Sequence, residues 1–163
     1  MPMIEKQAGF TLLEVLVAIV VLSLGLLGLA GLQAASLRNN QAAYYRGIAT
    51  QQTYDMADRI RANLAGVTAG DYNNLAAVIP ANPGCFTAGC SIANMAVTDH
   101  FQWNTVNAAL LPGGSGTVVC ADGPAAAGCT AATGNWLFNI TVSWTERTQA
   151  GNVVQSFVTR VAP

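Results

Sequence analysis

The residues that decide the fold run from Phe10 to Leu32 and read FTLLEVLVAIVVLSLGLLGLAGL. Glu14 is the only ionisable side chain in this stretch. At about 1.5 Å per residue, a helix of this length matches the thickness of the hydrocarbon core of a bilayer. We therefore expect residues 10–32 to form a transmembrane helix.

The residues around the apolar stretch argue against an ordinary secretory signal. Such a signal has a shorter apolar core that is followed by small residues at the cleavage site, whereas here the small residue Gly9 precedes the apolar run. A plain membrane anchor would still have to accommodate Glu14, because a charge inside a bilayer costs about 2.5–3.5 kcal/mol on insertion scales. The carboxylate therefore indicates a function and a partner. The structural alternative is a lone glutamate that snorkels to the membrane interface.

Residues 9–14 read GFTLLE and, with the short leader before them and the apolar span after them, resemble the class III signal of type IV prepilins. The resemblance implies that a prepilin peptidase cleaves between Gly9 and Phe10, removes residues 1–9 and N-methylates Phe10. It also implies a role for Glu14 in assembly. The N-terminal amine of a subunit is buried among apolar helices in the filament, and the carboxylate of a neighbour would offset that charge.

Three glycines recur at every third position within the span, Gly25, Gly28 and Gly31. Each costs about 1 kcal/mol of helix propensity relative to alanine. They could form a close helix–helix contact face. They could also mark a stretch that loosens when the helix leaves the membrane, or simply be tolerated there. The sequence does not separate these three interpretations.

An apolar stripe at three- and four-residue spacing continues beyond the membrane span, which is typical of a helix with one buried face. Its members are Tyr45, Ile48, Gln52, Met56, Ile60 and Leu64. Gly66 is the expected C-terminal stop. We expect residues 33–65 to be the amphipathic half of one long helix, which docks a globular head formed by residues 66–163.

The head shows the two-residue period of a β-strand over residues 136–145, where apolar and polar side chains alternate. Residues 146–152 are polar and predict a hairpin connection to a return strand at residues 153–161. A third strand is expected at residues 117–120 and a short helix at residues 99–111. The sequence thus predicts an α+β fold with a long N-terminal helix on a small antiparallel sheet, which is the type IV pilin fold that the resemblance implies.

Three further motifs narrow the resemblance. The segment DRIRAN at residues 58–63, the pair Asp99-x3-Trp103 and the segment LPGGSG at residues 111–116 are similar to segments of PilV-type minor pilins. This resemblance implies contacts with other minor and major pilins through the N-terminal helix. It also implies encounters with the prepilin peptidase and with the inner-membrane assembly platform.

Four cysteines follow the membrane span: Cys85, Cys90, Cys120 and Cys129. In an oxidising periplasm an even number predicts two disulfides, with three possible connectivities. The short loops favour the pairs Cys85–Cys90 and Cys120–Cys129. A zinc site is the alternative, but the spacing is not that of paired C-x2-C motifs and the chain has one histidine, His100.

Catalysis and nucleic-acid binding have little support in the sequence. The net charge is -1, and Arg147 and Arg160 do not make the basic face that DNA binding needs. The neighbours Asp99 and His100 could belong to a catalytic triad, but no G-x-S-x-G nucleophile turn is present. We expect His100 to be a surface or capping residue, and we expect no enzyme activity, cofactor, metal or nucleic-acid partner.

The resemblance therefore implies a minor pilin that helps to prime assembly of a type IV pilus, the filament of twitching motility, or that forms part of its tip complex. Such a subunit is a single-pass inner-membrane protein with a periplasmic C-terminal domain, and it enters the pilus on assembly. A pseudopilin of a type II secretion system is the alternative within the filament class. A pilin-like adhesin or DNA-uptake subunit is an alternative of a different class.

Overall fold

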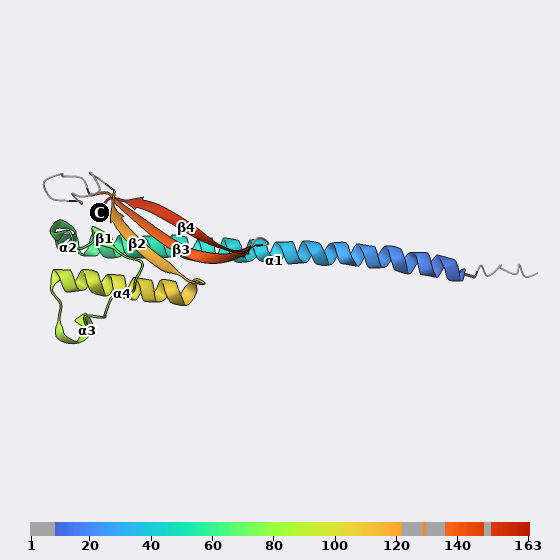
Figure 1. Cartoon of the computed structure of the whole chain (residues 1–163), viewed down its shortest axis with the longest axis horizontal. Coiled ribbons are helices and arrows are strands. Elements are labelled where there is room, and N and C mark those ends of the chain that lie inside the picture. Colours follow the sequence, from blue (N-terminus) through green and yellow to red (C-terminus); the bar gives the residue numbers. More distant parts are fainter. Residues whose placement is uncertain (1–8, 122–128, 130–135, 149–150) are drawn as a thin grey trace, which may run out of the picture. The chain divides into compact units, whose positions relative to one another are not determined.

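The computed structural model describes residues 9–121, 129, 136–148 and 151–163. The chain divides into two units, Met1–Gln41 and Ala42–Pro163. The first unit contains the beginning of helix α1 (Leu12–Ala62), and the second contains the rest of α1 and all the other elements (Figure 1). The two units are described separately.

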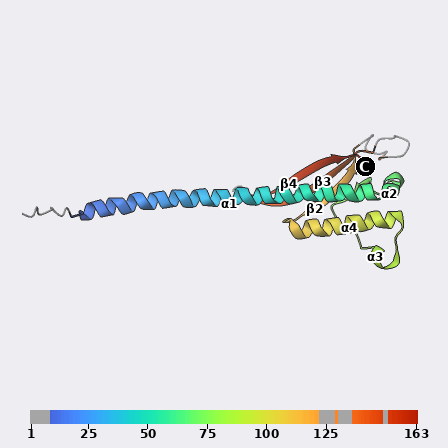
Figure 2. The same ribbon diagram turned by 180° about the vertical axis from the view of Figure 1, so that it is seen from behind.

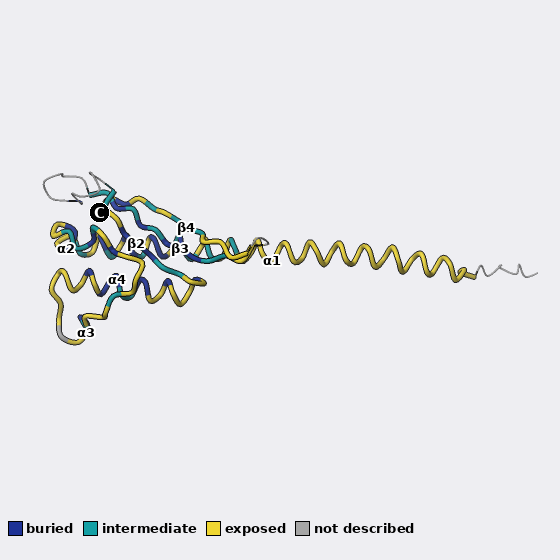
Figure 3. The backbone as a smooth tube through the Cα atoms, in the orientation of Figure 1, coloured by how far each residue is buried: buried dark blue, intermediate teal, exposed yellow. Residues whose placement is uncertain are grey.

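The first unit is a single helix whose described residues are all exposed (Figure 3). Its apolar side chains have no other part of the unit to pack against, and Leu13, Leu22 and Leu27 are more than half exposed. Exposed apolar surface of this extent marks a site of contact with a membrane or with other proteins. Ser23 lies in the middle of the apolar stretch, and its hydroxyl donates a hydrogen bond to the backbone oxygen of Val20 at 2.7 Å.

The second unit is built on a four-stranded antiparallel sheet in the order β1-β2-β3-β4. The strands are β1 (Asn74–Leu75), β2 (Ser115–Cys120), β3 (Phe138–Thr148) and β4 (Gly151–Val161). The helices besides α1 are α2 (Leu64–Ala69), α3 (Cys85–Ala88) and α4 (Ile92–Leu110). The predicted α+β class, with a long N-terminal helix on a small antiparallel sheet, is confirmed and is consistent with a type IV pilin fold.

The core lies between one face of the sheet and the two long helices (Figures 1 and 2). Alternate residues of β3 are buried, as the two-residue period predicts: Phe138, Ile140, Val142 and Trp144. The stripe of α1 that faces them includes Ala49, Met56, Ala57 and Ile60, all fully buried. Burying a side chain as large as Met56 or Ile60 stabilises a fold by roughly 1.5–3 kcal/mol, so the amphipathic half of α1 is part of the core of the head.

Helix α4 runs antiparallel to α1 and is held to it by polar contacts at several levels. The Trp103 indole Nε1–H donates to the backbone oxygen of Gln52 at 2.8 Å. Two turns further along α1, Arg59 donates to Gln102 Oε1 at 2.9 Å and to Asp99 Oδ1 at 3.3 Å. Each contact satisfies a partly or fully buried polar group, which would otherwise destabilise the fold by about 1–3 kcal/mol.

The LPGGSG segment connects α4 to β2, and two of its glycines are required by close approach. A Cβ at Gly116 would lie 2.2 Å from Cη2 of Trp103, and a Cβ at Gly114 would lie 2.1 Å from the backbone oxygen of Asn107. Asn104 then holds the start of β2, because its side chain accepts from the backbone N–H of Gly116 at 2.6 Å and donates to the Gly116 oxygen at 3.0 Å. The Asp99-x3-Trp103 and LPGGSG motifs therefore meet in one packing unit.

Several boundaries differ from the sequence prediction, and each difference has a local cause. Helix α1 ends at Ala62 instead of residue 65, because the Asn63 side chain accepts from the backbone N–H of Gly66 and starts α2. Helix α4 begins at Ile92 instead of residue 99, since Ser91 caps it through the N–H of Asn94 at 3.2 Å. The strands β1 and β2 and the helix α3 are short, and the sequence analysis predicted only β2 among them.

Candidate functional site

The residues of the predicted cleavage site lie at the start of α1. Gly9, Phe10 and Thr11 are outside the helix, and all three are exposed. The first helical hydrogen bonds run to Thr11, whose backbone oxygen accepts from Glu14 N at 3.1 Å and from Val15 N at 3.3 Å. The chain is therefore non-helical on both sides of the Gly9–Phe10 bond and becomes helical two residues later.

Thr11 is a functional candidate that the sequence analysis missed. Its hydroxyl Oγ1 lies 3.3 Å from the backbone nitrogen of Glu14 and accepts that N–H. This is the geometry of a helix N-cap, in which a Thr side chain satisfies a donor that has no partner inside the helix. The spacing T-x-x-E is the sequence signature of a capping box, so the signal was present in the motif.

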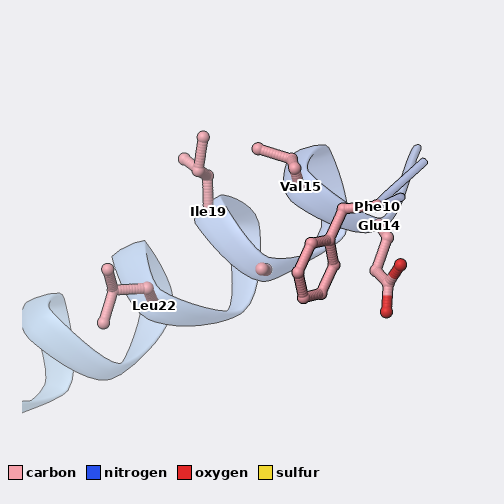
Figure 4. A pocket seen from close by; sticks show the side chains of 6 residues that line it. Phe10, Glu14, Val15, Ile19 and Leu22 are labelled. Atoms are coloured by element: carbon pink, nitrogen blue, oxygen red, sulfur yellow. The ribbon is translucent and has the colours of Figure 1, made fainter. Parts of the chain in front are cut away.

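The carboxylate of Glu14 lies on the exposed first turn of α1. Within the described part of the chain it has no hydrogen-bond or ion-pair partner. It borders an open groove along the helix, and Figure 4 shows the Phe10 ring folded back along α1 beside it. The other residues that line this groove are apolar: Val15, Ala18, Ile19 and Leu22. A carboxylate without a partner thus stands at the end of an apolar surface.

Helix α1 is long and apolar enough to cross a membrane, and no other helix in the described residues meets that criterion. The three glycines within its apolar part face open space, since an added Cβ at Gly25, Gly28 or Gly31 would meet nothing within 4 Å. Gly25 lies on the same side of the helix as Glu14 and Ala18, at offsets of 11 and 7 residues. The structure does not separate the three interpretations of these glycines.

The four cysteines lie in the head and form two disulfides. Cys85 is joined to Cys90 and Cys120 to Cys129, with Cα–Cα distances of 4.9 and 5.5 Å. These are the two local pairs that the sequence analysis favoured. Among the described residues there is no group of three or more His, Cys, Asp or Glu side chains that could hold a metal ion.

Asp99 and His100 are placed by packing and do not face one another as a catalytic pair. Asp99 accepts the hydroxyl of Tyr72 at 2.6 Å, and burial together with that contact raises the pKa of Tyr72 well above its ordinary value. His100 Nε2 lies 2.7 Å from the backbone oxygen of Ala76, and burial lowers the pKa of its imidazole. Both residues therefore stabilise the head.

The expectation that His100 is a surface or capping residue is wrong. His100 is only 7% exposed. The error follows from the early start of α4, because His100 lies in the third turn of a long helix and on its buried side instead of at the beginning of a short one.

Comparison with known families identifies a motif in one region of the chain. Residues 5–30 match the family model of the prokaryotic N-terminal methylation motif. Neither a curated protein nor a solved structure gave a significant match to the chain. The motif indicates a type IV pilin or pseudopilin, a structural class of protein, and together with the apolar α1 it fits a membrane-anchored pilin.

Proposed function

We propose that this protein is a minor pilin of the PilV type, a structural subunit that helps to prime a type IV pilus or forms part of its tip complex. In this proposal a prepilin peptidase cuts between Gly9 and Phe10 and methylates the new N-terminus. Before assembly, α1 anchors the subunit in the inner membrane with its head in the periplasm. The assembly platform then moves α1 from the bilayer into a sheath of pilin helices.

The observation that carries the proposal is the carboxylate of Glu14, which has no partner among the described residues and lies in the first turn of an exposed apolar helix. A lone charge in hydrocarbon is costly, so Glu14 needs a cation when α1 is covered by lipid or by other helices. Cleavage would create such a cation, the amine of Phe10, on each neighbouring subunit. Pairing of amine and carboxylate between subunits would offset two buried charges at once.

The head supports the assignment to minor pilins through the packing of its motifs. The motif residues Arg59, Asp99, Trp103 and Gly116 all contribute to the α1–α4 contact or to the start of β2. In this proposal the three motifs, one on α1 and two in the head, are therefore a signature of how the head is docked on α1. A pseudopilin would share the N-terminal motif and α1. This alternative is distinguished from a minor pilin by the phenotype of a strain that lacks the gene.

The first test replaces Glu14. Glu14→Gln keeps the size of the side chain but removes its charge, so the processed protein should remain in the membrane and be lost from sheared pili. Membrane insertion should be unchanged or better, since the span becomes more apolar. Glu14→Asp is the matched control, because it keeps the carboxylate and should retain part of the incorporation.

Two further strains test the remaining parts of the proposal. Gly9→Val should leave an unprocessed chain, which the intact mass of the membrane form would reveal. Deletion of the gene should reduce surface pili and twitching and leave type II secretion intact. Wild-type amounts of the Glu14→Gln protein in sheared pili would refute the pairing role, and a defect in type II secretion alone would assign the protein to the pseudopilins.

A further inference from the structure

The sequence motif at the start of α1 has the chemistry of a helix start signal. Thr11 occupies the N-cap position, Glu14 the third helical position and Val15 the fourth. Phe10, the residue before the cap, lines the same groove as Val15. Thr11 and Glu14 have the spacing of a capping box, of which the structure shows the bond that the Thr11 side chain accepts, and Phe10 and Val15 occupy the two positions of a hydrophobic staple.

The cap determines on which side of the helix boundary the Gly9–Phe10 bond lies. Without an acceptor at Thr11, the first N–H groups of α1 lose a partner, and in an apolar environment there is no water to replace it. Winding Phe10 and Gly9 into the helix would be one way to provide partners for these groups. The Gly9–Phe10 peptide would then lie inside a helical turn.

We propose that Thr11 is a positioning residue for leader removal, which holds the Gly9–Phe10 bond outside the helix and so presents it to the peptidase as an extended segment. This inference rests on the proposed cleavage after Gly9. Hydrolysis adds water to that amide: the Gly9 carbonyl carbon gains the hydroxyl, its bond to the Phe10 nitrogen breaks, and the nitrogen takes the proton. A peptidase must bring water to one face of the carbonyl and a proton to the Phe10 nitrogen, and the hydrogen bonds and side chains of a helical turn block that access.

The test compares side chains at position 11 by whether they can cap a helix. Thr11→Val has nearly the same shape but no acceptor, and it should slow leader removal about fivefold, the factor that corresponds to the loss of an N-cap. Thr11→Ser and Thr11→Asn are both good caps and should be processed at the wild-type rate. Ser23→Ala is the matched control, since it removes a hydroxyl from the same helix without affecting its start.

The measurement is the initial rate of leader removal in a pulse–chase experiment on the full chain, in cells that contain the peptidase. Rates are normalised to the amount of membrane-inserted precursor, so that poor insertion does not imitate slow cleavage. Wild-type processing of Thr11→Val would overturn the proposal. So would slow processing of Thr11→Asn with normal processing of Thr11→Ser, because the peptidase would then be reading the side chain itself. Failure of the wild-type chain to lose residues 1–9 would instead refute the proposed function.

Discussion

The replacement of Gly116 by alanine tests how the head is assembled on α1. The new Cβ would lie 2.2, 2.4 and 2.7 Å from three carbons of the Trp103 ring. Ordinary van der Waals contacts of a Cβ are 3.4–4 Å, so the ring or β2 must shift by roughly 1 Å. Overpacking of a core in this way costs about 1–3 kcal/mol.

The same shift would lengthen or break the hydrogen bond between Trp103 and the backbone of Gln52. Trp103 donates to the Gln52 oxygen on α1 at 2.8 Å, and the loss of such a bond costs about 1 kcal/mol. The expected destabilisation of Gly116→Ala is therefore about 2–4 kcal/mol. For a domain of this size 1 kcal/mol corresponds to roughly 4 °C, so the midpoint of thermal unfolding should fall by about 8–16 °C.

Tryptophan fluorescence of the full chain in detergent follows this transition, because Trp103 and Trp144 are both buried. Gly47→Ala is the matched control. Gly47 lies within α1, and a Cβ there would meet nothing within 4 Å, so the same substitution should raise stability by up to about 1 kcal/mol. A Gly116→Ala protein that melts within about 2 °C of the wild type would show that the Trp103–Gly116 contact does not hold α4 on the sheet.

Three further results are expected from the structure. Arg59→Met should destabilise the head by about 1–2 kcal/mol in thermal unfolding. Arg61→Met removes only an exposed pair with Asp58 and should cost less than about 0.5 kcal/mol, so equal effects of the two substitutions would contradict the role of the Arg59 contacts. Burial lowers the pKa of His100, so the unfolded chain takes up its proton first as the pH falls below about 6.5; stability should decline from pH 7 to pH 5, and His100→Gln should remove part of that slope. Peptide mapping of the unreduced protein should return the two local disulfides and no free thiol, and a cross-link between the two loops would contradict this connectivity.

Those parts of the structure that depend on a regular period could be predicted from the sequence. The alternation over residues 136–145 predicts which side chains of β3 are buried, and the stripe that begins at Tyr45 predicts the buried side of α1 as far as Ile60. Its last member, Leu64, is exposed, because α1 ends at Ala62 and Leu64 begins α2. Both patterns arise because one large apolar surface packs against another, so every residue of the buried face contributes to the same hydrophobic periodicity. The membrane-length apolar run is the strongest case, because every residue in it contributes.

Those parts that depend on single contacts could not be predicted in the same way. The start of α4 depends on the cap at Ser91, and the burial of His100 follows from that start. The glycine at position 116 could be recognised as a turn residue, but its contact with Trp103 joins segments that only the fold brings together. Thr11 is an exception, because its capping signal is local: the T-x-x-E spacing lies within the residues that also form the cleavage motif.

The carboxylates of Asp99 and Glu14 differ in whether the described residues supply a partner. Asp99 is 8% exposed, and the head itself supplies its partners, the Tyr72 hydroxyl at 2.6 Å and the Arg59 guanidinium at 3.3 Å. Glu14 has no such partner within the described residues. The next cation along α1 is Arg38, about 36 Å away at 1.5 Å per residue, so the helix cannot fold a charge back onto it. A buried carboxylate needs a cation or a proton. Under the proposed function, that cation would be the N-terminal amine of a neighbouring subunit, because the rest of α1 offers no cation within reach of Glu14.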